Sequence, residues 1–155
     1  MTSLSYDEIF SRFFSRVEAY DFLDLSPEQS TDYLNAWLHG ACSKPFLRRL
    51  FSSIVYDDEV EELTFSMKYS VDDFSDKDFV IEVISLGIAI EWLEPKVNSI
   101  MNLSQMFASK EEKFYSQANH LMELKNSLNY FRKTQRQIIV DRGFAWNSYL
   151  GGDNL

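Results

Sequence analysis

The stretch FVIEVISLGIAIEWL, residues 79–93, decides the fold of this chain. Only Glu82, Ser85, Gly87 and Glu91 interrupt its run of apolar residues. A helix that is apolar nearly all round must be wrapped by other elements, so the stretch predicts the buried central helix of a single core. A membrane span would need about 18 to 20 nearly uncharged residues. This stretch is shorter and carries two glutamates.

Start and stop signals flank this central helix. Ser75 predicts its N-terminal cap, with Asp76 and Asp78 in a first turn where the helix dipole favours acidic side chains. Pro95 predicts a break or a kink, because the residue before a proline is pushed out of the helical region. A second helical piece is then expected over 95–107.

Capping boxes mark the other helices. Ser5 with Glu8, and Ser26 with Gln29, have the spacing in which each side chain bonds the backbone N–H of the other residue. Apolar residues then recur at helical spacing. The expected helices cover 6–19, 27–42, the short stretch PFLRRLFSSI, and 110–141, the longest, which Gly143 ends.

Residues 63–69, LTFSMKY, alternate strictly between apolar and polar side chains. Such alternation predicts a half-buried strand. A lone strand needs a partner, and two remain open: residues 53–56 of the same chain, which would make a hairpin, or a strand of a neighbouring subunit.

The predicted fold class is therefore mainly α. We expect a helical bundle around the buried central helix 79–93 and the long C-terminal helix 110–141, with a small β-strand or hairpin near 53–69. Residues 1–143 would form a single helical domain, and 144–155 an extended arm. Such arms are usually frayed ends, and the alternative is docking onto a partner through the aromatic residues Phe144, Trp146 and Tyr149.

Composition limits the class of protein. The net charge is −9 over 155 residues. This argues against sequence-specific nucleic-acid binding, since Lys and Arg supply most of that affinity by neutralising phosphates. The start, MTSLSYDEIF, has no signal-peptide pattern, and we expect no membrane association. Cys42 is the single cysteine, which is typical of a chain that folds in a reducing cytoplasm.

Residues that could carry chemistry are few. His39 and Cys42 would share a helix face, but no further ligands lie close in the sequence, so we expect ordinary packing. Glu91 and Glu94 would form a general acid and base pair only beside a cleft. Pairing with Lys96 or with a basic residue of the last helix is the better interpretation.

The acidic cluster at 72–78 lacks the glycine and the closing glutamate of an EF-hand loop, so a solvated loop is expected. No phosphate-binding loop or nucleophile motif occurs. We therefore predict no metal site, no cofactor and no enzymatic activity.

Charge is divided unevenly along the chain. Residues 1–78 carry 16 acidic and 7 basic side chains, whereas 79–155 carry 8 of each. One interpretation is an ordinary solvated surface. The other is a contact in which the acidic face of one copy meets the basic face of the next, closing a ring or growing a filament. The residues of this hypothetical interface are Asp57, Asp58, Glu59, Glu61 and Glu62 on the acidic side and Arg132, Lys133, Arg136 and Arg142 on the basic side.

Two segments carry a resemblance to a known group of proteins. They are IAIEWLEPKVNSIMNL, which contains Glu91 to Pro95 and Val97 to Ser99, and KFYSQANHLMELKNSL, which contains Tyr115 to Leu121. Together with an acidic N-terminal helix pair, they resemble small head–tail connector, or neck, proteins of tailed bacteriophages that infect Gram-positive hosts. The likeness covers roughly residues 79–130.

The resemblance implies a structural protein of the virion that is folded in the host cytoplasm. Such proteins form a ring, commonly a dodecamer, below the portal, and they link the capsid to adjacent neck and tail proteins while DNA passes through the lumen. In that setting the strand 63–69 would extend a neighbour's sheet. The competing class is a small acidic cytoplasmic binding protein, either an inhibitor or an assembly chaperone.

Overall fold

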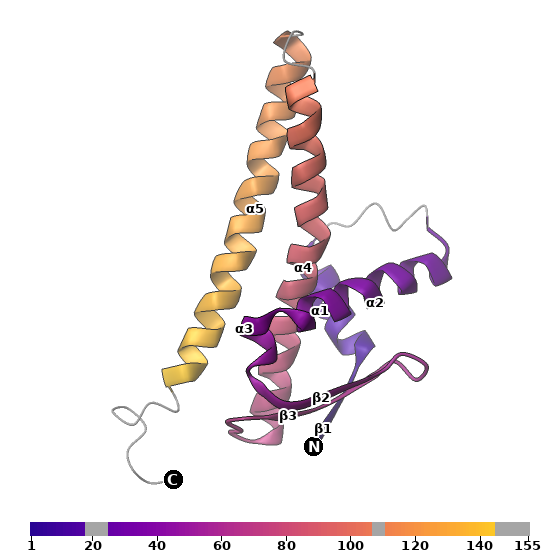
Figure 1. The fold of residues 1–155 in the computed structure, drawn as a ribbon, viewed down its shortest axis with the longest axis vertical. Helices are drawn as coiled ribbons and strands as arrows, with labels where there is room; N and C mark the ends of the chain where they lie inside the picture. Colours follow the sequence, from indigo (N-terminus) through magenta and orange to yellow (C-terminus); the bar gives the residue numbers. More distant parts are fainter. Residues whose placement is uncertain (18–24, 107–110, 145–155) are drawn as a thin grey trace.

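The fold is built on two long antiparallel helices, as the computed structural model shows (Figure 1). It describes the backbone of residues 1–17, 25–106 and 111–144, and their side chains except at 100–118 and 144. The protein is mainly helical, with a small three-stranded antiparallel sheet at one end. The predicted fold class is confirmed.

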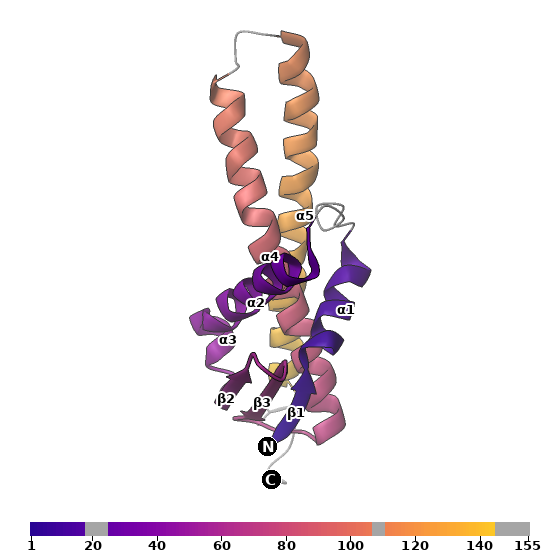
Figure 2. The ribbon, with the colours of Figure 1, turned by 90° about the vertical axis from the view of Figure 1, so that its right-hand side faces the viewer.

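Helix α4, Asp73–Met106, contains the stretch that dominates the sequence. Val80, Ile84, Leu86 and Ile88 are fully buried along it, as expected of a helix wrapped on all sides. Helices α1 and α2 and the sheet lie against its first half (Figures 1 and 2). The central helix is therefore confirmed.

Two details of α4 differ from the sequence prediction. Asp72, rather than Ser75, caps the helix, because its carboxylate accepts the N–H (2.7 Å) and hydroxyl (3.1 Å) of Ser75. Of the break or kink predicted at Pro95, the break is wrong, since α4 continues to Met106. The buried side chains of Leu93 and Val97 hold the helix on both sides of the proline, so packing offsets the lost backbone hydrogen bond.

Helix α5, Glu111–Phe144, runs back along α4. It buries Leu128, Phe131 and Gln135, and the Gln135 side-chain amide donates to the carbonyl of Val83 on α4 at 3.0 Å. Both helices extend well beyond the other elements (Figures 1 and 2). The predicted long C-terminal helix is confirmed, but it continues through Gly143, which was predicted to end it, to Phe144.

The N-terminal helices begin where their capping boxes predict. Both predicted boxes are present, on α1, Tyr6–Arg16, and on α2, Pro27–Ser43. Val17 already has an extended backbone, so α1 ends before the predicted residue 19. The predicted short helix is only one turn long, α3, Pro45–Arg48, and the chain then becomes a strand.

The sheet has the order β1-β3-β2 and is antiparallel throughout. Strands β2, Phe51–Asp57, and β3, Glu62–Met67, form the hairpin that was one of the two alternatives. The short strand β1, Thr2–Ser5, is not predicted by the sequence. Because β3 lies between β1 and β2, both its edges are occupied, so this strand has no free edge with which to extend a neighbour's sheet.

Candidate functional site

The five acidic residues of the predicted interface lie together, at the turn of the β2–β3 hairpin. We call this segment, Asp57–Glu62, the hairpin tip. One oxygen of Asp57 accepts the N–H groups of Glu59 (3.1 Å) and Val60 (3.2 Å). Glu61 has a positive φ of 54° and its carbonyl accepts the N–H of Tyr6 at 2.9 Å. The tip is therefore held by hydrogen bonds at both of its ends.

Asp58 anchors the hairpin tip to two helices. The Tyr6 hydroxyl donates to its carboxylate at 2.6 Å, and His39 Nε2 lies 3.0 Å from both carboxylate oxygens. The hydrogen bond from Tyr6 and the contact with His39 outweigh the effect of burial and lower the pKa of Asp58. Burial, with Asp58 beside it, raises the pKa of the Tyr6 hydroxyl. Asp58 is thus a structural residue and not a free surface charge.

His39 and Cys42 do not form a reactive pair. The His39 ring faces Asp58 and meets the ring of Tyr56 edge-on at 4.5 Å. Burial raises the pKa of Cys42 to about 12, so its thiol stays protonated and unreactive near neutral pH. Among the residues that the structure describes, no group of three or more His, Cys, Asp or Glu side chains could hold a metal ion.

Two acidic side chains of the hairpin tip remain uncommitted. Neither Glu59 nor Glu61 has an ion-pair partner within the described parts of the chain, whereas Glu62 accepts the hydroxyl of Ser3. Val60, between them, leaves 65% of its surface exposed. The tip therefore presents an apolar residue flanked by free carboxylates.

Arg142, predicted to be a surface interface residue, is instead committed inside the protein. Its guanidinium donates to Asp76 at 2.5 Å and to the carbonyl of Tyr69 at 3.2 Å, and it lies 4.4 Å from the centre of the Phe79 ring. Only 12% of the Arg142 side chain and 3% of the Asp76 side chain are exposed. This ion pair ties the end of α5 to the start of α4.

The pKa of Asp76 reflects this buried position. Burial alone would raise it, but three hydrogen bonds stabilise the carboxylate more strongly and lower the pKa. The donors are the Ser70 hydroxyl, the Val71 N–H and Arg142. The sequence predicted Asp76 as a first-turn acid, which is correct, but gave no signal for its partner 66 residues away.

The other three basic residues of the predicted interface line one face of α5. Arg132 pairs with Glu94 of α4 at 2.5 Å. Lys133 and Arg136 are exposed, and no ion pair holds either of them among the described residues. These two side chains are the uncommitted cations of the predicted basic face.

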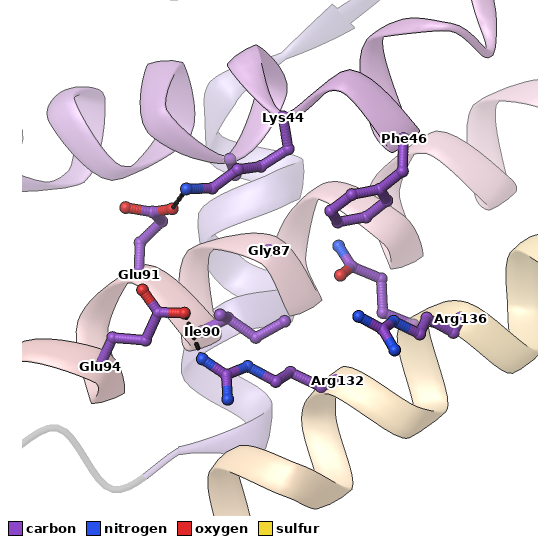
Figure 3. A pocket seen from close by; sticks show the side chains of 10 residues that line it. Lys44, Phe46, Gly87, Ile90, Glu91, Glu94, Arg132 and Arg136 are labelled. Carbon is purple, nitrogen blue, oxygen red and sulfur yellow. Dashed lines mark hydrogen bonds and ion pairs between the residues drawn. The ribbon is translucent and has the colours of Figure 1, made fainter. Parts of the chain in front are cut away.

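Two hollows flank Arg132 and Arg136. The first is a cleft of about 300 Å³ where α2, α3, α4 and α5 meet (Figure 3). The second is an open hollow of about 360 Å³ on α5 itself, which we call the basic furrow. The basic furrow is lined by Asn129, Arg132, Lys133, Arg136, Gln137 and Val140.

The carboxylates of the cleft are both engaged by cations. Glu91 lies 3.2 Å from Lys44, and Glu94 pairs with Arg132 (Figure 3). The sequence prediction of a partner on the last helix is correct for Glu94. It is wrong for Glu91, whose partner comes from the end of α2, while Lys96 lies 4.8 Å from the centre of the Trp92 ring. Among the described residues that line the cleft, there is no uncommitted acid and base pair.

The remaining candidate residues lie in the predicted arm. Phe144 is the last residue of α5, and its side chain is not among those described. Trp146 and Tyr149 lie outside the described residues. Within the described ranges, no helix is long and apolar enough to cross a membrane.

Comparisons with protein-family profiles, with curated proteins and with solved structures found no match to this chain.

Proposed function

We propose that this protein is a structural component of a tailed-phage virion, a head–tail connector or neck protein that forms a ring below the portal and links the capsid to the tail. It acts by assembly, and not as an enzyme. Its partners are further copies of itself, the portal protein and the adjacent neck or tail proteins.

The observation that carries this proposal is the separation of uncommitted charge on a single protomer. The carboxylates of Glu59 and Glu61 lie at the hairpin tip and the cations of Lys133 and Arg136 lie on α5, and none of the four has an ion-pair partner among the described residues. The hairpin turn and α5 are on opposite sides of the molecule (Figure 1). Opposite charges that cannot meet within one copy favour a head-to-tail contact between copies, which closes into a ring when the rotation permits.

The shape of the protomer supports the same role. The helix pair α4–α5 extends far beyond the base that the sheet, α1 and α2 build around it (Figures 1 and 2). Copies arranged around an axis would present these helix pairs in parallel to the next component. The segments that resemble neck proteins, 88–103 and 113–128, belong to this helix pair.

The test is to locate the protein in virions. Tailed particles are purified from a culture in which this gene carries a small epitope tag, and they are labelled with gold-conjugated antibody for electron microscopy. Label at the junction of head and tail supports the proposal. A protein that is found only in the particle-free lysate contradicts it and supports the small acidic binding protein instead. A tagged capsid protein serves as the control for labelling efficiency.

A further inference from the structure

We propose that the hairpin tip of one copy docks into the basic furrow of α5 on the next copy, with Val60 entering the furrow between Lys133 and Arg136. This rests on the proposed function in one respect, since a ring requires such a contact between copies.

The hairpin tip has the form of an inserting element. Val60 is 65% exposed at the turn, with Glu59 before it and Glu61 after it. Burial of this exposed apolar side chain in a partner is favourable, and the charged side chains on either side of it give the contact its direction.

The hairpin tip is also held in place before any partner arrives. Asp57 closes the turn through two backbone N–H groups, and Asp58 is fixed by Tyr6 and His39. The carbonyl of Glu61 accepts the N–H of Tyr6. A surface that is already ordered loses little conformational entropy on binding, so more of the contact energy remains as affinity.

The basic furrow offers the complementary pattern. Lys133 and Arg136 lie one turn apart on α5, and Val140, four residues beyond Arg136, is 52% exposed in the same furrow. Asn129 and Gln137 add side-chain amides to the lining. An exposed valine beside two cations matches a valine beside two carboxylates in both hydropathy and charge, and none of these four charges is paired within the described structure.

A second copy fits the furrow better than nucleic acid does. The net charge of −9 repels a polyanion, and within the described parts of the chain only two of the cations in the furrow are uncommitted. The hairpin tip is a small anionic surface that supplies two carboxylates for those two cations. Because the hairpin tip and the basic furrow are different surfaces of one copy, each copy can engage two neighbours, as a ring requires.

Charge exchange tests this contact. Glu59→Lys and Arg136→Glu are made separately, because neither side chain has a structural partner among the described residues. Each variant alone should lose self-association by at least about tenfold, since like charges would then face each other. An equimolar mixture should recover it, because the two variants can alternate, so that the introduced lysine meets the introduced glutamate and the native carboxylate meets the native guanidinium. Sedimentation velocity at low salt measures all three.

Matched controls are available on α5. Glu123→Lys and Lys125→Glu change the net charge by the same amounts at exposed positions outside the furrow, and they should associate as the wild type does. Far-ultraviolet circular dichroism checks that each variant is folded. The proposal is overturned if the controls weaken association equally, if the mixture does not recover it, or if the wild type stays monomeric throughout.

Failure of this contact and failure of the proposed function are distinguishable. Gold label at the neck together with a failed charge exchange would remove the hairpin–furrow contact and leave the virion role intact. Recovered association in the mixture, with no protein in the particles, would establish the contact between copies and remove the virion role.

Discussion

The two ends of the α4–α5 helix pair differ in how many neighbours enclose them. At the base, the sheet, α1 and α2 surround α4, and residues 79–93 are apolar apart from four positions. The other end projects beyond the sheet, α1 and α2, and in this projecting part each helix has mainly the other helix as its neighbour (Figure 1). Residues 119–127 of α5 are there mostly exposed. The apolar content of each stretch thus follows the number of elements packed against it.

The largest effect should separate two arginines of the same helix. Arg142→Ala leaves the buried carboxylate of Asp76 without its partner, so the free energy of unfolding should fall by about 3–5 kcal/mol. Arg132→Ala breaks a half-exposed pair with Glu94, and the loss should stay below about 1 kcal/mol. Urea denaturation measures both. Equal losses would contradict the expectation that the buried Arg142–Asp76 pair contributes more to stability than the half-exposed Arg132–Glu94 pair.

A pair of apolar truncations should sharpen the same contrast. Ile84 is fully buried in the base, so Ile84→Ala should cost about 2–5 kcal/mol through lost burial and the cavity left behind. Leu124, in the projecting part, is only partly buried, and Leu124→Ala should cost clearly less. Thermal melts followed by circular dichroism give the comparison. A larger loss for Leu124→Ala would contradict it.

The smallest expected effect is a difference in how steeply stability falls in acid. The folded-state pKa of Asp76 is lowered, so its contribution to stability is present above its ordinary value of about 3.9 and is lost as pH falls through the folded-state pKa. The stability of the wild type should therefore fall more steeply below about pH 4 than that of Asp76→Asn. Part of the slope should remain in the variant, because the pKa values of Asp58 and Glu8 are lowered as well.

Urea titrations at a series of pH values measure this difference. If stability fell equally with pH in the wild type and in Asp76→Asn, the three hydrogen bonds would not lower the pKa of Asp76, and the prediction would be contradicted. The Asp78→Asn variant is a suitable control, since Asp78 lies on the same helix and is exposed.

Local signals in the sequence were sufficient for most of the secondary structure. The capping boxes at Ser5 and Ser26 predict the starts of two helices, because a cap depends on residues only three apart. The alternation at 63–69 predicts a strand for a similarly local reason. Strand β1 was missed because four residues, TSLS, carry no periodicity that separates a strand from a loop.

The candidate surfaces were predicted as groups but not as individual contacts. Both charged groups follow from counting residues, and they lie at the hairpin turn and along α5. Asp58, Arg132 and Arg142 are committed within the chain, and their partners are far away in the sequence or on another element. No local pattern distinguishes them from Glu59 and Arg136, which remain free in the described structure.

The sequence by itself determined that α4 is central, since an apolar run of this length has no stable place on a surface in water. It also determined the caps of α1 and α2 and the division of charge. Only the tertiary structure decided that α4 continues through Pro95, that β3 occupies the middle of the sheet, and which charges stay free. Each of these depends on contacts between residues distant in the chain, whose packing energy outweighs the local preference.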